Sequence, residues 1–399
     1  MSKPERAPLP KGYMTIWFTV ALDLVGFGIV VPILGVYAKR YGASGYAVGW
    51  MFATFSLAQL VAAPLLGRLS DRIGRKPVII ISLLGTAVGS FVTGAAGALW
   101  VLFLGRAIDG ASGASLSVAQ AAVADMATPE QRPKLVGMLG AAFGIGFVFG
   151  PAIGGLAALG GPHVPFYVAA ALATVNAVAA MIRLPETRVS HTPRTKGPKA
   201  PRLPIMRRLA IIGFLGTFAF TAFEATFSLF GSVRFSLTEG SSAGVFLGIG
   251  LVLVAVQGGG FGRLAAKVPA GRLYPMALVL VVIGLAVVGA SKSWALLIIG
   301  LLVLSVGQGV ASPSLTEMVN HAAPPERRGE AMGYQQSSYA VGRVLGPPLA
   351  GSAFDRIGVW SPMVAGAAVT AMALCLVLVW GMHRSATSVP PVHVNPDAA

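Results

Sequence analysis

The feature that most constrains this 399-residue chain is a series of apolar blocks, each about twenty residues long. A helix needs about 20 mostly apolar residues to cross the hydrocarbon core of a bilayer. Only helices and closed barrels satisfy their backbone hydrogen bonds in lipid, and these blocks are continuous rather than alternating. Charged residues make up only 11% of the chain, whereas they make up about a quarter of an average soluble domain. The pattern therefore predicts an all-α membrane protein.

We count twelve blocks of this kind, and together they fill most of the chain. They lie at roughly 14–37, 46–66, 78–96, 99–124, 135–159, 164–184, 208–231, 242–262, 273–291, 294–318, 330–353 and 359–382. The short stretches between them leave no room for a sizeable soluble domain. The sequence therefore predicts twelve transmembrane helices.

The polar stretches divide these predicted helices into two groups of six. The longest polar stretch, 185–207, holds five prolines and is typical of a flexible linker. It separates a predicted six-helix bundle at 14–184 from a second one at 208–384. Residues 1–13 form a predicted N-terminal segment, and the polar tail at 385–399 is expected to be disordered.

The distribution of lysine and arginine predicts the orientation of the chain. With both termini on one side of the membrane, twenty-three basic residues fall on that side and five on the other, while Arg106 and Arg343 lie inside predicted spans. Basic residues concentrate in cytoplasmic loops. We therefore predict a multi-pass protein of the inner (plasma) membrane with both termini in the cytoplasm. This topology explains the net charge of +16, which in a soluble protein would suggest nucleic acid, and we expect no nucleic-acid partner.

Two stretches of the chain resemble each other at a constant offset of 196 residues. The segment at 129–155 reads PEQRPKLVGMLGAAFGIGFVFGPAIGG, and the segment at 325–351 reads PERRGEAMGYQQSSYAVGRVLGPPLAG. The matched pairs include Gly146 with Gly342 and Gly150 with Gly346. A duplicated six-helix unit with a site between the halves is a common plan of secondary transporters. The repeat predicts two pseudo-symmetric bundles.

Four short motifs lie at the spans and the loop where one transporter family carries its signatures. They are GRLSDRIGRK at 67–76, LGR at 104–106, GFVFGPAIGG at 146–155 and DLVGFG at 23–28. These motifs resemble the signatures of the major facilitator superfamily, and more closely those of its twelve-span drug:proton antiporters, including the tetracycline exporters. The resemblance covers nearly the whole chain and implies a monomeric exporter. The chain departs from the tetracycline exporters in span 3, where Gly89 lies in a region in which they carry an acidic residue.

Ionisable residues inside the predicted spans are the candidates for proton coupling, because a charge at the bilayer centre costs at least about 2.5–3.5 kcal/mol. Asp23, about a third of the way into span 1, is placed to bind and release a proton, unless it is a fixed partner of a nearby group. Arg106 and Asp109 share one helix face. The resemblance implies that the arginine tunes proton transfer, and the alternative is a permanent structural pair. Glu317, near the cytoplasmic end of span 10, and Glu224 complete the set.

The candidates for substrate binding centre on span 7, where Glu224 is surrounded by phenylalanines. A carboxyl group among aromatic rings can recognise a cationic amphiphile through charge and cation–π contacts. The alternatives are that Glu224 is only a proton site and that the rings face lipid or neighbouring helices. Arg343 stands where the repeat has the apolar Phe147, so it needs an acidic partner, either Glu224 or Glu317. The predicted substrate-binding residues are Glu224, Phe220, Phe223, Phe227 and Arg343.

The loop between spans 2 and 3 is predicted to be a conformational switch. Its cations can pair with a carboxylate at the cytoplasmic end of span 4, where Asp125 lies. Asp71 can meet a helix N-terminus across the interface between the two halves. The resemblance implies that this network holds the outward-open state, and the alternative is a plain cytoplasmic anchor. Ala266 replaces the acid in the second copy of the motif. The predicted switch residues are Gly67, Asp71, Arg72, Gly74, Arg75, Lys76 and Asp125.

The motif in span 5 consists of small residues that allow close helix packing. Its predicted members are Gly146, Gly150, Pro151, Gly154 and Gly155. The proline would bend the helix, since it removes a backbone hydrogen bond. A bend that controls sealing and tight packing alone are both compatible with this pattern.

Other kinds of chemistry have little support in the sequence. The chain contains no P-loop pattern, its five histidines lack metal-ligand spacing and it has one cysteine, so we predict no metal and no cofactor. We expect a secondary transporter that exports hydrophobic or cationic small molecules in exchange for protons, rather than an enzyme. One alternative is a proton-coupled transporter of a metabolite such as a sugar or an amino acid. Another is a membrane-embedded enzyme or sensor.

Overall fold

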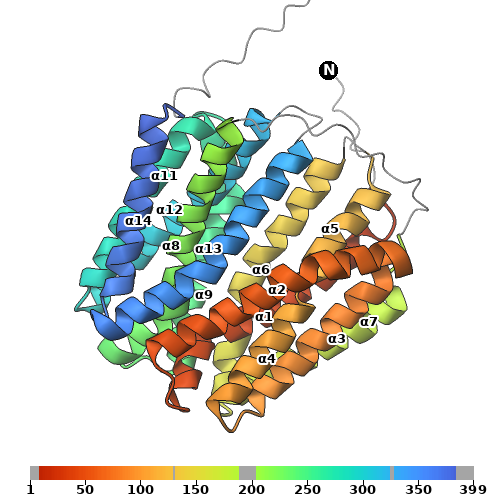
Figure 1. Ribbon diagram of the computed structural model, residues 1–399, viewed down its shortest axis with the longest axis horizontal. Coiled ribbons are helices and arrows are strands. Elements are labelled where there is room, and N and C mark those ends of the chain that lie inside the picture. The colour runs from red at the N-terminus through yellow and green to blue at the C-terminus, as the bar shows by residue number, and fades with distance from the viewer. Residues whose placement is uncertain (1–8, 129–130, 188–203, 324–327, 383–399) are drawn as a thin grey trace, which may run out of the picture.

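The structure is a computed structural model that describes residues 9–128, 131–187, 204–323 and 328–382. These residues form helices and contain no β-strand. The first half of the chain (9–187) forms α1 (Tyr13–Lys39), α2 (Gly45–Ile73), α3 (Arg75–Gly94), α4 (Leu99–Ser112), α5 (Ser115–Met126), α6 (Arg132–Ala158) and α7 (Val164–Arg183). The second half (204–382) forms α8 (Pro204–Arg234), α9 (Glu239–Ala255), the π-helix η1 (Val256–Gly260), α10 (Phe261–Ala265), α11 (Ala270–Ala290), α12 (Trp294–Ala322), α13 (Arg328–Arg356) and α14 (Ser361–Val379). Figure 1 shows the two halves lying side by side.

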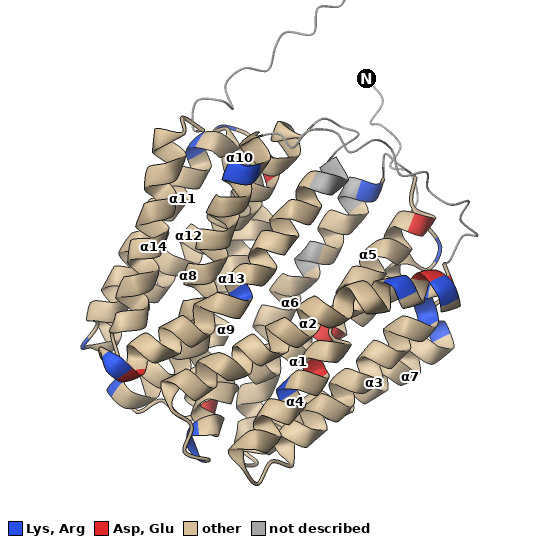
Figure 2. Ribbon diagram, in the orientation of Figure 1, with Lys and Arg blue, Asp and Glu red and all other residues tan. Residues whose placement is uncertain are grey.

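Within the described residues, ten helical segments are long and apolar enough to cross a membrane. The other two predicted spans correspond to α4 with α5, which are individually short, and to α13, which is not among the ten. The prediction of an all-α membrane protein is therefore confirmed, while the count of twelve spans stays a prediction. Figure 2 shows that charged residues gather mainly at the two ends of the bundle, as expected for helices in lipid.

The predicted span 99–124 is not one helix, because it is interrupted between α4 and α5. Gly113 leaves helical geometry with φ −73° and ψ 36°, and α5 starts at Ser115. The interruption frees backbone carbonyls, and the side-chain amide of Gln59 donates a 2.7 Å hydrogen bond to the carbonyl of Gly113. Irregular backbone at membrane depth persists only where protein groups satisfy it in this way.

The predicted span 242–262 also departs from a regular α-helix. It begins at Glu239, and it passes through one π-helical turn at Val256–Gly260 before α10. Three of the five residues in that turn are glycine, which is about 1 kcal/mol less favourable than alanine in a helix interior. Weak intrinsic helicity at this point is consistent with a local change in winding.

Equivalent glycines make equivalent helix contacts in the two halves. A Cβ atom at Gly150 of α6 would lie 2.5 Å from the backbone of Gly28 in α1, and one at Gly346 of α13 would lie 2.6 Å from the carbonyl of Phe218 in α8. Because only glycine allows backbones to approach this closely, the contacts explain why the repeat keeps these positions small. The sequence repeat thus corresponds to a repeated packing of α6 on α1 and of α13 on α8.

Among the described residues, the hydrophobic core that the two halves share lies at one end of the bundle. One buried cluster contains residues of both halves, among them Leu34 and Phe52 of the first and Phe227 and Leu301 of the second. Two further clusters each belong to a single half. We call the end with the shared core the junction end, and the end that carries Arg75 and the loop after α10 the basic end.

Polar contacts also join the halves at the junction end. Arg40 forms a 2.7 Å ion pair with Glu239, and the ammonium of Lys39 donates to the hydroxyl of Ser232 over 3.2 Å. The carboxylate of Asp355 accepts hydrogen bonds from the backbone at the start of α2. The described structure is therefore sealed at the junction end by packing and by charge.

Candidate functional site

Asp23 lies in α1 and has a neutral partner. The hydroxyl of Ser115, the first residue of α5, donates a hydrogen bond to the carboxylate of Asp23. The interruption of the fourth span creates this contact, because it places a new helix start beside α1. Among the described residues Asp23 forms no ion pair, so its charge is not neutralised by a cation.

Arg106 and Asp109 of α4 form a buried ion pair with an N–O distance of 2.7 Å. The exposed fraction is 2% for Arg106 and 8% for Asp109. The guanidinium also lies over the ring of Phe55 in α2, 4.4 Å from its centroid. Removing one partner of a buried pair leaves an uncompensated charge that costs about 3–5 kcal/mol. In this conformation Arg106 and Asp109 are therefore in direct contact, as an ion pair.

The position of Asp109 explains why span 3 of this chain has Gly89, and no acidic residue, at this point. A Cβ atom at Gly89 of α3 would lie 2.7–2.9 Å from the backbone nitrogen, Cα and Cβ of Asp109. A side chain at position 89 is therefore excluded by this packing. The space beside α3 is occupied by an acidic residue that belongs to α4.

Glu224 and Arg343 stand on adjacent helices, α8 and α13. Glu224 is buried, with 8% exposure, and Arg343 lies close enough to interact with it electrostatically. The two groups form no ion pair in the described residues, and the Nε atom of Arg343 is buried without a hydrogen-bond partner there. The other candidate partner, Glu317, is at the basic end of α12, 3.9 Å from His321. Of the two predicted partners, Glu224 is thus the one near Arg343.

The phenylalanines of α8 belong mainly to the shared core. Phe223 and Phe227 have exposed fractions of 2% and 0%, and Phe227 packs edge-on against Phe246 of α9. Their rings are therefore packed inside the protein in this conformation, and the prediction that they contact substrate stays a prediction. Phe220 is partly buried at the edge of the cluster, so it remains available for contact.

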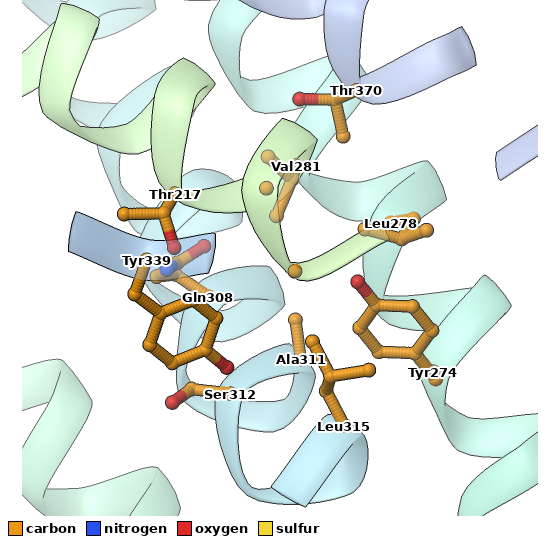
Figure 3. A pocket seen from close by; sticks show the side chains of 12 residues that line it. Thr217, Tyr274, Leu278, Val281, Gln308, Ala311, Ser312, Leu315, Tyr339 and Thr370 are labelled. Carbon is orange, nitrogen blue, oxygen red and sulfur yellow. The ribbon is translucent and has the colours of Figure 1, made fainter. Parts of the chain in front are cut away.

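A pocket of about 80 Å³ with both polar and apolar lining lies inside the second half, between α8, α11, α12, α13 and α14. Its polar lining consists of Thr217, Tyr274, Gln308, Ser312, Tyr339 and Thr370. Figure 3 shows Thr217, Gln308 and Tyr339 on one side and Tyr274 on the other. Sites for drug-sized ligands have about 300–1,000 Å³, whereas a water molecule occupies about 30 Å³ of liquid. The pocket therefore has room for a few water molecules and not for a drug-sized ligand.

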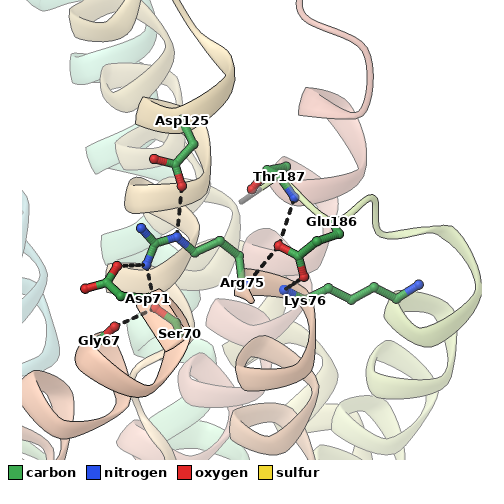
Figure 4. Close-up of polar contacts among 8 residues, drawn as sticks. All are labelled: Gly67, Ser70, Asp71, Arg75, Lys76, Asp125, Glu186 and Thr187. Carbon is green, nitrogen blue, oxygen red and sulfur yellow. Dashed lines mark hydrogen bonds and ion pairs between the residues drawn. The ribbon is translucent and has the colours of Figure 1, made fainter. Parts of the chain in front are cut away.

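Arg75 is the centre of the predicted switch. Its guanidinium contacts Asp71 at 2.7 Å, Asp125 at 2.9 Å and the hydroxyl of Ser70 at 2.6 Å (Figure 4). The Arg75 side chain is only 8% exposed, whereas that of Asp71 is 61% exposed. The predicted pairing with Asp125 is present. Asp71 pairs with Arg75 here, and the predicted contact with a helix of the other half is not among the contacts described.

The start of the linker is part of this network. The carboxylate of Glu186 accepts hydrogen bonds from the backbone N–H groups of Arg75 (2.9 Å) and Lys76 (3.2 Å), so it caps α3. Gly74 has a φ of 107°, and a Cβ atom there would lie 2.8 Å from the Glu186 carboxyl carbon. The first residues of the predicted linker 185–207 thus contact α3 through Glu186, and the flexible linker itself stays a prediction. Residues 188–203 lie outside the described part.

The remaining predicted switch and motif residues have simpler surroundings. Gly67 accepts a 2.7 Å hydrogen bond from Ser70, and the Lys76 side chain points away from the network (Figure 4). Arg72 lies in the last turn of α2. In α6, Gly146 and Gly154 face α1, whereas Gly155 faces Ala243 of α9. Pro151 lies within the helix. The glycines of this motif thus serve close packing on both halves.

Sequence reasoning missed several residues of these networks. Ser115 and Gln59 depend on the interruption of the fourth span, for which the small-residue run at 110–115 was the available signal. Glu239 and Asp355 lie at predicted span ends, where acids are unremarkable. Their roles depend on contacts between residues about 200 and 310 positions apart.

The comparisons with known proteins agree with this architecture. The sequence profile of the Major Facilitator Superfamily matches residues 16–289 and 260–396. Multidrug resistance protein 1 of Bacillus subtilis (strain 168) is 30% identical over 374 residues, which cover 92% of this chain and 96% of that protein. The class B tetracycline resistance protein of Escherichia coli is 30% identical over 341 residues, covering 82% and 84% respectively. Quinolone resistance protein NorA of Staphylococcus aureus (strain MRSA252) is 27% identical, covering 94% and 98%.

Solved structures share the fold. The human organic anion transporter MFSD10 (TETRAN) superposes with a TM-score of 0.70 at 24% identity, covering 94% of this chain and 100% of that one. A bacterial homologue of the human lysosomal transporter Spinster, in an inward-facing and unoccupied conformation, gives 0.79 at 14% identity, covering 97% and 98%. Because the family profile and the relatives both cover most of the sequence, the chain belongs to the Major Facilitator Superfamily, a family of membrane transporters.

Proposed function

We propose that the protein is a proton-coupled antiporter that exports hydrophobic or cationic drug-like molecules across the inner membrane by alternating access. Relatives named for resistance to multiple drugs, tetracycline and quinolones support the substrate class. The concentration of basic residues supports a cytoplasmic location for the basic end.

The observation that carries the proposal is a pair of carboxyl groups within the helix bundle, the buried Glu224 and the partly buried Asp23, neither of which forms an ion pair among the described residues. Asp23 has a hydroxyl partner, and Glu224 has no hydrogen-bond or ion-pair partner among the described residues. Burying an uncompensated charge is costly, so such a group is stabilised either by a proton or by a cationic ligand. A proton and a cationic substrate then compete for the same carboxylates. Competition of this kind couples inward proton movement to outward substrate movement.

The two ends of the bundle suggest how access alternates. At the junction end the halves share a core and polar contacts, and at the basic end the described residues form a separate core in each half. We propose that this conformation is closed at the junction end and open toward the basic end. Asp71, which is exposed and here pairs with Arg75, would then meet a helix N-terminus of the second half when the basic end closes.

Everted membrane vesicles that contain the protein test this function. Ethidium, a fluorescent cation, should be transported when a pH gradient is imposed, and the transport should stop when an ionophore collapses that gradient. Asp23→Asn and Glu224→Gln should each lower the rate by about tenfold or more, equivalent to about 1.4 kcal/mol. Asp397→Asn, near the end of the chain, is the matched control. Equal transport with the gradient collapsed and no other ion gradient present would rule the proposal out.

A further inference from the structure

Glu224 occupies a defined position on the face of α8 that is turned toward the first half. Ser228, one turn further along α8, packs against Gly35 of α1, and Ser232 accepts a hydrogen bond from Lys39. Residues four apart lie on the same helix face. Glu224 therefore lies on this same face, one turn from the last of these contacts in the direction of the basic end.

Arg343 occupies the corresponding position on α13. Gly351 and Pro347 pack against the backbone of Gly45 and Gly49 in α2, so they mark the face of α13 that meets the first half. Arg343 precedes Pro347 by four residues and shares that face. It too lies one turn beyond the sealed region, toward the basic end.

Two opposite charges thus stand on neighbouring helices at the inner limit of the junction seal. They are close enough to interact electrostatically, yet they form no ion pair among the described residues. The Nε atom of Arg343 is buried there without an acceptor. A guanidinium with a buried N–H group that lacks an acceptor is costly in an apolar environment, and a cationic ligand bound at Glu224 would leave Arg343 without a counter-charge.

We propose that this transport site selects zwitterionic amphiphiles, whose carboxylate binds Arg343 while their cationic group binds Glu224. The inference rests on the proposed function and narrows its substrate class. A guanidinium presents paired N–H donors that match the two oxygens of a carboxylate. Phe220, one turn before Glu224 and only partly buried, offers an aromatic surface to the body of the ligand. A ligand with both charges neutralises both side chains at once.

Tetramethylrhodamine and its methyl ester form a suitable probe pair, because they share one fluorophore and differ in a single free carboxylate. Their dissociation constants are measured by fluorescence anisotropy on the purified full-length protein in lipid nanodiscs. The unmodified protein should bind the acid more tightly than the ester. Preference for the ester would overturn the inference without any variant being needed.

Three variants locate the preference. Arg343→Gln should lower the ester-to-acid ratio of dissociation constants by about tenfold, which corresponds to a difference in binding free energy of about 1.4 kcal/mol. Arg343→Lys, which keeps the charge without the planar fork, should give an intermediate ratio. Arg356→Gln, an exposed arginine on the same helix, is the matched control and should keep the original ratio. If both Arg343 variants keep it as well, Arg343 does not bind the carboxylate.

The same dyes separate failure of this inference from failure of the proposed function. Transport of ethidium, which has no carboxylate, tests proton-coupled export alone. If a pH gradient drives ethidium transport and the acid is not preferred over the ester, only the zwitterion inference fails. If neither ethidium nor the dyes respond to the gradient, the proposed function itself fails.

Discussion

The carboxylate of Asp355 in α13 accepts a 2.8 Å hydrogen bond from the backbone N–H of Gly45 in α2, across the two halves of the chain. Its second oxygen accepts from the N–H of Tyr46 at 2.7 Å. The first N–H groups of a helix have no partner within the helix, and a negative charge near them is favourable. The sequence predicted such a contact for Asp71 at the other end. In the described structure Asp355 makes an acid-to-helix contact of this kind between the halves, at the junction end.

Replacing Asp355 with asparagine should weaken the junction seal. The variant loses the charge from two charge-assisted hydrogen bonds, and loss of a capping group costs about 0.5–2 kcal/mol. The population open at the junction end should therefore rise several-fold. Spin labels at the exposed positions Trp100 and Ile357 report the open state as a population at longer distance in double electron–electron resonance. Arg356→Gln is the neighbouring control, and an unchanged distance distribution in Asp355→Asn would contradict the role of the cap.

The ion pair between Arg40 and Glu239 should contribute less to the seal. Arg40 is half exposed, with 52% of its side chain accessible, whereas Glu239 is 9% accessible. The hydrogen bond that Arg40 donates to the carboxylate of Glu239 raises the pKa of the Arg40 guanidinium, which therefore stays charged at every working pH. Exposed pairs are worth about 0.2–1 kcal/mol and weaken with salt. A double-mutant cycle of Arg40→Gln and Glu239→Gln, measured by thermal unfolding, should give a coupling in that range. A coupling that is larger and insensitive to salt would show that the pair is desolvated.

Gly74→Ala should be destabilising, because alanine rarely adopts the φ of 107° found there and its Cβ would collide with the carboxylate of Glu186. Gly67→Ala is the matched control within the same motif. It lies inside α2, and a Cβ atom added there would have no contact within 4 Å outside the helix's own backbone, so alanine should be neutral or stabilising by up to about 1 kcal/mol. Thermal unfolding in detergent compares the two variants. Equal melting temperatures would mean that Glu186 does not fix α3 as described.

Gly150→Ala should disrupt the packing of α6 on α1. The added methyl group would stand 2.5 Å from the backbone of Gly28, and overpacking of a tight interface costs about 1–3 kcal/mol. Gly248→Ala in α9 has nothing within 4 Å of the new methyl group, so it should leave the melting temperature nearly unchanged. Similar losses for both variants would indicate that helix propensity, and not contact, controls stability at these positions.

Some of the site was predictable because its chemistry is local in sequence. Arg106 and Asp109 are three residues apart, so helical geometry alone brings them to one face. Arg75 and Asp125 are further apart, yet both follow from a motif and from the ends of adjacent spans. The core position of Phe223 and Phe227 was not predictable, since aromatic rings on a membrane helix have no sequence mark that separates packed faces from open ones.

The sequence by itself determined the helices, their membrane character and the repeat, because twenty-residue apolar blocks have few other ways to satisfy their backbone. The tertiary structure alone decided where the fourth span breaks, which acid caps which helix, and which charges are left unpaired. Those outcomes depend on the contact of backbones hundreds of residues apart, as between Asp355 and Gly45. Hydropathy determines which segments span the membrane, and the packing of the helices determines which residues contact one another.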